Sequence, residues 1–391
     1  KGSNTMCKKL IQQSQLKSIY KAFQALLVAV LLTAFESHFD AYIPFPPLTR
    51  APQRIALLLP LQKEWKPIAH AIQSGFLEAN ATAQQPIHVK VIDTSQDENL
   101  EKSYQEAVRW KADLLVGPLL KEDLKTLSKF KQLKIPTLTL NYLHQETAPA
   151  NFYQFGLSPL DELQALMEQA QAKQQTSALL LVPDNTWGEM LLAYWMQHWE
   201  SLGGKVAGVL KYSNKTTVLN YQIRQFLDFK PPNQRRNDFD VIFLGATSEM
   251  GRQINPLLAF YFASRIPIYA TAAIYEANIP TYLNRDLDNI VIADAPWNIG
   301  IQNIHTALHK RFTQKSPKQF ERYARYYALG VDAFLLAQKL LFLDQDNQQT
   351  IEGASGELAL NENRDVIRKP LCAKIKQGIP RPLPQDVSID R

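Results

Sequence analysis

Two histidines have the spacing that most resembles a metal site. His305 and His309 are four residues apart, so on a helix they would share one face and could approach the same ion. Zinc catalysis also needs a third protein ligand and an activated water, and nothing else in the sequence points to one. We therefore expect a solvated helix surface at this position and no bound metal.

Three acidic residues near position 95 have the composition of an acid–base site. Asp93, Asp97 and Glu98 follow an apolar run and precede a helical pattern. Paired carboxylates can transfer protons in catalysis, but acids between a strand and a helix also organise the loop and cap the helix. The loop interpretation is favoured.

Sequence motifs for catalysis are absent from the whole chain. It contains no G-x-G-x-x-G, no G-x-x-x-x-G-K-[ST], no G-x-S-x-G, no H-E-x-x-H and no C-x-x-C. The two cysteines, Cys7 and Cys372, exclude a disulfide framework and a multi-cysteine metal site. Cys372 is interpreted as a small buried side chain. We expect a non-enzymatic protein without a cofactor.

The composition is that of a globular protein whose charge is concentrated at one end. Of 391 residues, 46% are hydrophobic and 20% are charged, and the net charge is +6. Residues 1–50 hold six basic and two acidic residues, a net +4, which leaves +2 for the remaining 341. A nearly neutral body argues against a nucleic-acid partner.

The first fifty residues have the pattern of an export leader. Residues 22–35 are almost entirely apolar and follow four lysines at positions 8–21. The run is shorter than a bilayer span, which favours a signal peptide, with an uncleaved anchor or a buried helix as alternatives. No cysteine comes directly after it, so the sequence does not support a lipid anchor. Residues 42–53 are rich in proline and predict a semi-rigid linker.

From residue 54 onward, strand-like runs alternate with helical patterns. A continuous apolar run such as IALLLPL predicts a strand covered on both faces, and apolar residues at helical spacing predict a helix. The first part predicts strands at 55–61, 88–93, 113–117 and 135–140, and helices at 67–82, 99–112 and 121–133. The second part predicts strands at 178–183, 205–210, 240–245, 266–271 and 289–294, and helices at 160–173, 187–202, 219–229 and 250–263. The last part predicts helices at 303–313 and 320–343, a strand at 356–361, a short element at 366–376 and a proline-rich tail at 378–385.

This order predicts an α/β protein with two lobes, each a doubly wound parallel sheet, arranged as a clamp. Trp195 and Trp199 share a helix face and are expected in the core. Open parallel sheets bind ligands at the carboxyl ends of their strands. The residues at such ends that would line the cleft are Gly117, Pro118, Thr139, Asn141, Tyr142, Ser158 and Trp187. For Gly117-Pro118, a tight turn is an equally good interpretation.

Eleven strings in register resemble the carboxyl-terminal domain of the LppC/LpoA family of penicillin-binding-protein activators. They are RIALLLPL, AIQSGFLEA, VKVIDT, ADLLVGPLLKEDL, IPTLTLN, NFYQFGLSPLDE, ALLLVPDNTWGE, SLGGKV, DVIFLGAT, RQINPLLAFYFASRIPIYATAAIY and YALGVDAF, and the resemblance covers about residues 54–384. It implies a type I periplasmic-binding-protein fold. The expected division is 1–53 for leader and linker, 54–155 and 297–345 for lobe one, 156–296 and 346–384 for lobe two, and 385–391 for a tail.

The resemblance also implies a function. Members of this family bind and activate a class A penicillin-binding protein, the peptidoglycan synthase, from the outer-membrane side of the periplasm. The sequence departs from the family in lacking the lipoprotein cysteine and the helical repeats that precede this domain. Leu119 and Leu120 offer no hydroxyl to an amino acid. The alternative is a periplasmic receptor that closes on a small molecule or a muropeptide.

Overall fold

The computed structural model describes residues 51–96, 100–129, 133–143, 149, 151–301, 305–345 and 349–384. The expected leader, linker residues 42–50, Asp97, Glu98 and the tail 385–391 lie outside these ranges. None of the helices in the described ranges has the length and apolar character needed to cross a membrane.

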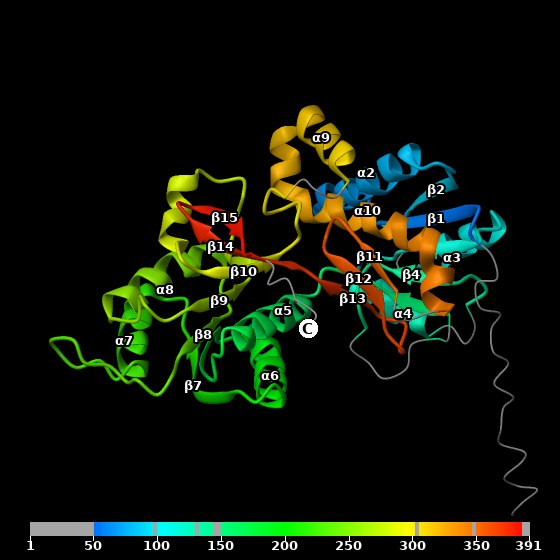
Figure 1. The fold of residues 1–391 in the computed structure, drawn as a ribbon. Helices are drawn as coiled ribbons and strands as arrows, with labels where there is room; N and C mark the ends of the chain where they lie inside the picture. The colour runs from blue at the N-terminus through cyan, green and yellow to red at the C-terminus, as the bar shows by residue number, and fades with distance from the viewer. Residues whose placement is uncertain are drawn as a thin grey trace, which may run out of the picture. The chain divides into compact units, whose positions relative to one another are not determined.

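The first lobe is built on a parallel five-stranded sheet (Figure 1). In spatial order its strands are β2 (His88–Asp93), β1 (Arg54–Leu59), β3 (Leu114–Val116), β4 (Thr137–Thr139) and β5 (Phe152–Gln154). The helices that connect them are α2 (Lys66–Thr82), α3 (Glu101–Arg109) and α4 (Lys121–Ser128). Residues 55–59 of β1 are completely buried, as the continuous apolar run predicts. Strand β5 was not predicted, because NFYQFG carries no alternation that separates it from a loop.

The second lobe is built on a seven-stranded sheet. Its order is β15 (Ile379–Pro382), β14 (Leu371–Lys376), β10 (Val291–Asp294), β9 (Ile268–Thr271), β8 (Val241–Leu244), β6 (Ser177–Pro183) and β7 (Lys205–Tyr212). Its helices are α5 (Pro159–Ala172), α6 (Thr186–Ser201), α7 (Thr216–Phe226) and α8 (Ser248–Phe260). Strands β6 to β10 pair in parallel. Trp195 and Trp199 are buried against Phe243, which confirms their predicted place in the core.

Two antiparallel strands extend this second sheet at one edge. Strand β14 pairs with β10, and β15 pairs with β14. The prediction of a tail over 378–385 was wrong for 379–382, which form β15. Pro380 and Pro382 are compatible with a strand here because β15 is an edge strand, where a missing N–H need not interrupt a ladder.

The late helices and a small third sheet complete the first lobe. They are α9 (Thr306–Lys315), α10 (Pro317–Gln345), and the antiparallel strands β11 (Thr350–Glu352), β12 (Glu357–Leu360) and β13 (Val366–Lys369). We expected all of residues 346–384 in the second lobe. Strands β11–β13 lie instead in the first, because Ile351, Leu358 and Val366 join the core that contains Ile55 and Leu336.

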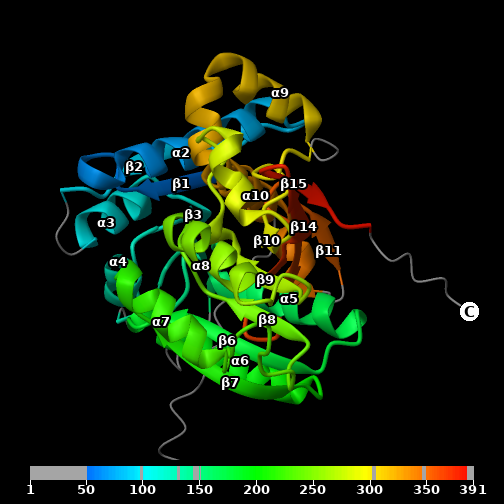
Figure 2. The ribbon, with the colours of Figure 1, turned by 90° about the vertical axis from the view of Figure 1, so that its left-hand side faces the viewer.

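Helices α2 and α10 lie side by side in both views (Figures 1 and 2). Two glycines allow this close approach. A Cβ at Gly75 would lie 2.2 Å from the carbonyl oxygen of Tyr327, and one at Gly330 would lie 2.1 Å from that of Ile72. The two helix backbones are therefore in direct contact.

Candidate functional site

A cavity lies at the carboxyl ends of β3 and β4, where an open parallel sheet holds its ligands. Its volume is about 360 Å³. The residues that line it are Trp65, Ile68, Leu119, Leu120, Lys121, Glu122, Leu140, Asn141, Leu157, Tyr326 and Leu329. The wall is mainly apolar, and it contains no serine or threonine.

A sharp turn after β3 shapes this cavity. The Gly117-Pro118 peptide bond is cis, and Gly117 has φ 100°. A Cβ on Gly117 would lie 2.2 Å from the carbonyl oxygen of Leu58, so only glycine fits. The turn directs Leu119 and Leu120 to the cavity, while Gly117 and Pro118 themselves are buried beneath it.

The other predicted cleft residues are spread over separate places. Thr139 is buried and donates its hydroxyl to the carbonyl oxygen of Asn141, at 2.8 Å. Asn141 lines the cavity and donates to the carbonyl oxygen of Leu119, at 3.1 Å. Tyr142 donates its hydroxyl to the carbonyl oxygen of Val366, at 2.7 Å, and burial raises its pKa.

Ser158 and Trp187 both serve helices of the second lobe. Ser158 is the N-cap of α5, and its hydroxyl accepts a hydrogen bond from Leu160 N. Trp187 is half-buried in the first turn of α6 and packs on the core of this lobe. A ligand-binding role for these residues stays a prediction, and of the seven only Asn141 lines the cavity.

An arginine of the first lobe occupies the carboxyl ends of β9 and β10 in the second. Arg325 of α10 donates to both carboxylate oxygens of Asp294, with Nε–Oδ1 2.8 Å and Nη2–Oδ2 2.7 Å. Its Nη2 also donates to the carbonyl oxygen of Ala272, at 2.7 Å. Asp294 is 1% exposed and accepts a further bond from Asn298. A bidentate arginine–carboxylate pair is both strong and directional.

A second buried arginine connects the first lobe to the start of α5. Arg368 of β13 is 2% exposed. Its Nη2 donates to the carbonyl oxygen of Ser158, at 3.3 Å, and its Nη1 to that of Ser355, at 3.2 Å. The carboxylates of Asp161 and Glu162 each lie 3.6 Å from its guanidinium. Arg368 thus ties together the two chain segments that cross between the lobes after β5 and after β13.

Burial dominates the protonation of the acids near Arg368. It raises the pKa of Asp161 and of Glu162 to about 7, although the charge of Arg368 opposes the rise. Burial raises the pKa of Asp332 to about 6, against hydrogen bonds from Ser355 and Ala354 that favour its ionised form. Because their pKa values are raised, Asp161, Glu162 and Asp332 hold their protons more tightly in the folded chain than in the unfolded one.

Sequence reasoning missed this network, although α10 carried a signal for it. The run RYARYYALGVDAFLLAQKLLFL predicts a helix that is apolar on most faces. Arg325 and Asp332 are the charged residues in its apolar part, and both make buried contacts. A charge inside an apolar helix needs a partner, but the sequence does not say which.

The histidines do not form the solvated surface that we predicted. His309 is 4% exposed and packs edge-on against Trp297 and Phe320. Burial lowers its pKa and that of His305. Within the described ranges no cluster of three or more potential ligands could hold a metal ion. Asp93 accepts hydrogen bonds from Leu61 and Ser95, the loop role predicted for it.

Comparisons with known proteins agree with this fold. The C-domain of LpoA from Haemophilus influenzae, described as a regulator of PBP1A, superposes with a TM-score of 0.72 at 23% identity, over 84% of this chain and 99% of that one. A solute binding protein of an ABC transporter from Rhodopseudomonas palustris HaA2, in complex with p-hydroxybenzoic acid, superposes with a TM-score of 0.59 at 12% sequence identity. The match covers 84% of this chain and 95% of that one.

Two lobes of this kind define the chain as a type I periplasmic-binding-protein-like fold. A family model described as "LppC putative lipoprotein" matches residues 48–378, so the chain belongs to that family. Penicillin-binding protein activator LpoA of Histophilus somni (strain 129Pt) is 24% identical over 86% of this chain and 55% of its own length. Penicillin-binding protein activator LpoA of Vibrio cholerae (strain M66-2) is 26% identical over 81% of this chain and 56% of its own length. The chain spans about half the length of these relatives.

Proposed function

We propose that the chain is a non-enzymatic regulator that binds and activates a class A penicillin-binding protein, a peptidoglycan synthase, in the periplasm at the outer-membrane side. Relatives that share this fold region are named as activators of penicillin-binding proteins. The observation that carries the proposal is the ion pair between Arg325 and Asp294.

The ion pair fills the place where the second sheet of a solute receptor would hold its ligand. Ligands of open α/β sheets bind outside the carboxyl ends of the strands. Here the chain's own Arg325 occupies the ends of β9 and β10, because it donates hydrogen bonds to the carbonyl oxygen of Ala272 and to the carboxylate of Asp294. This arrangement supports the use of the fold as a platform for another protein.

Exposed aromatic residues on the second lobe supply a suitable contact surface. Phe260 at the end of α8 is 69% exposed, and Phe262 is 50% exposed. Arg235 donates to the carbonyl oxygen of Phe262, at 2.8 Å. Aromatic residues and arginine are enriched where protein interfaces gain most of their binding energy. We propose that this corner, defined by Phe260, Phe262 and Arg235, contacts the synthase.

Activation would then be a shift in the population of synthase conformations. A regulator changes an equilibrium only by binding one state more tightly than the other. The platform therefore has to favour the active state of the synthase.

The test is the rate of peptidoglycan synthesis by the cognate class A synthase with and without this chain. We expect faster glycan polymerisation or cross-linking, together with a complex that can be isolated. An unchanged rate together with no complex at micromolar concentrations would overturn the proposal.

A second function is favoured by the cavity of about 360 Å³ beside Asn141, which is in the size range of small-molecule sites. In this alternative the chain is a receptor for a small molecule. A ligand present at 100 times its Kd would add about 2.7 kcal/mol to the free energy of unfolding. A thermal-shift screen of metabolites and muropeptides separates the two functions, since a solute receptor gives a hit without the synthase.

A further inference from the structure

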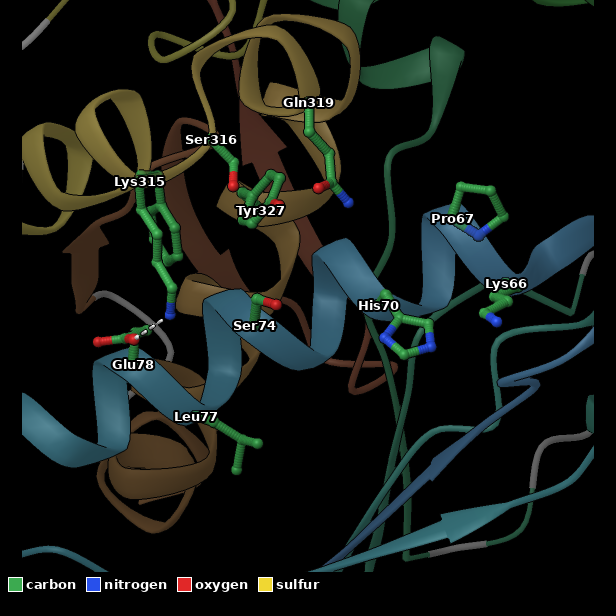
Figure 3. A pocket seen from close by; sticks show the side chains of 11 residues that line it. Lys66, Pro67, His70, Ser74, Leu77, Glu78, Lys315, Ser316, Gln319 and Tyr327 are labelled. Atoms are coloured by element: carbon green, nitrogen blue, oxygen red, sulfur yellow. Dashed lines mark ion pairs between the residues drawn. The ribbon is translucent and has the colours of Figure 1, made fainter.

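A second cavity lies on the first lobe, between α2 and the corner where α9 meets α10 (Figure 3). Its volume is about 650 Å³, within the range of small-molecule sites. It is separate from the cavity at the strand ends, because the two share no lining residue.

Regular spacing on α2 builds one wall of this cavity. Lys66, His70 and Ser74 are four residues apart and therefore lie on one face of the helix. Ser316 and Gln319 line the cavity from the opposite corner (Figure 3). The contact of α2 with α10 at Gly75 holds the two walls at a fixed separation.

The polar groups in this wall have unused hydrogen-bonding capacity. Among the described residues, no side chain or backbone group pairs with the side chains of Lys66, His70, Ser74 or Gln319. Serine, glutamine and histidine side chains can each donate and accept. A ligand with hydroxyl and amide groups would match this set. Leu77 and the buried rings of Phe312 and Tyr327 add an apolar side.

The charges around the cavity favour an anion. Glu78 is the acid in its lining, and Arg311 pairs with it at 3.0 Å. Lys315 lies farther away, 3.7 Å from the other oxygen of Glu78. Arg311 and Lys315 both pair with Glu78, and the ammonium group of Lys66 is the lining cation that has no partner among the described residues.

We infer that this cavity binds a small carboxylated saccharide. Lys66 binds the carboxylate, and His70, Ser74 and Gln319 hydrogen-bond to hydroxyl and amide groups. The probe is N-acetylmuramic acid, which carries a carboxylate, hydroxyl groups and an acetamide. Its choice rests on the proposed function at the cell wall, but the binding measurement needs no synthase, so a negative result would leave the activator proposal untouched.

The experiment compares two sugars by saturation-transfer NMR and calorimetry on the full chain. N-acetylmuramic acid should bind and N-acetylglucosamine, which lacks the carboxylate, should bind about tenfold more weakly or not at all. The variant K66Q should weaken the binding of N-acetylmuramic acid about tenfold, the effect of losing one hydrogen bond to a charged group. The matched control K310Q changes an exposed lysine of α9 outside the cavity and should bind like the unchanged chain.

Several results would overturn the inference. The first is the absence of saturable binding at about 10 mM sugar. The second is equal binding of the two sugars, and the third is a loss of binding in K310Q as large as in the cavity variant. Tighter binding of a tri-glutamate peptide, lost in K66Q, would identify a protein-docking surface instead. If K66Q lost its helical circular dichroism, Ser74→Leu, which fills the cavity from α2, would replace it and should abolish sugar binding.

Discussion

Arg325 and Asp294 form a bidentate ion pair, 2.8 and 2.7 Å long, that joins α10 of one lobe to the last parallel strand of the other. Because Asp294 is almost completely buried, the pair is held away from the solvent that weakens surface ion pairs. The junction of the lobes is thus a place where charge directly affects stability.

Arg325→Leu should lower the free energy of unfolding by about 3 kcal/mol, because Asp294 would be left buried without its partner. Urea denaturation followed by circular dichroism measures this loss. Lys310→Gln on α9 is the control and should change stability by less than about 0.5 kcal/mol. A loss for Arg325→Leu as small as for the control would show that the pair contributes nothing to the fold.

Stability should fall as the pH rises from 6.5 to 8. The folded-state pKa values of Asp161 and Glu162, raised to about 7 chiefly by burial, lie above those of the unfolded chain, so the native state binds more protons there. Their contribution is therefore present at lower pH and is lost through pH 7, by up to about 1 kcal/mol for each group.

Urea midpoints across this window test the pH prediction. The pKa values of His305 and His309 are lowered, so their effect has the opposite sign and falls mainly below pH 6.5. The double variant D161N/E162Q should flatten the dependence. An unchanged slope in that variant would assign the protons to other groups.

Ser355→Ala should cost about 2 kcal/mol of stability. Its hydroxyl donates to the buried carboxylate of Asp332 at 2.5 Å, and an unsatisfied buried acceptor is destabilising by about 1–3 kcal/mol. Ser128→Ala on α4 is the matched control, since its hydroxyl only returns to the carbonyl oxygen of Lys125. Equal stability of the two variants would contradict the prediction.

Gly75→Ala should destabilise the chain although alanine favours helices over glycine by about 1 kcal/mol. The new methyl group would lie 2.2 Å from the carbonyl oxygen of Tyr327, so α2 and α10 would have to separate, at a cost of about 1–3 kcal/mol. Ser74→Ala, one position away, should stay within about 0.5 kcal/mol. A stabilised Gly75→Ala variant would mean that the helices separate freely.

The double variant F260S/F262S should weaken the synthase complex at least tenfold without loss of stability, because it removes two exposed aromatic contacts. Co-sedimentation and the synthesis assay measure this. Phe342→Ser removes an exposed aromatic of α10 and should leave the complex intact. Loss of binding in the control alone would place the contact on the first lobe.

The βα alternation was enough to predict the fold, because each apolar run has to be covered by the helix that follows it. The charged network could not be predicted, since its partners are far apart in the sequence. In β13, the alternation gives no warning, because Ile367 is exposed and Arg368 is buried. The contacts of Arg368 with Glu162 and Asp161 become visible only in the folded structure.

The connectivity of the first lobe has a consequence for the order of folding. Its core combines β1 near the start of the described chain with α10 and with β12, about 300 residues later. Most of the second lobe, from α5 to β10, is one continuous segment. During synthesis or export, therefore, the core of the first lobe cannot form until the last part of the chain has emerged. We expect this lobe to be the last part to become resistant to proteases.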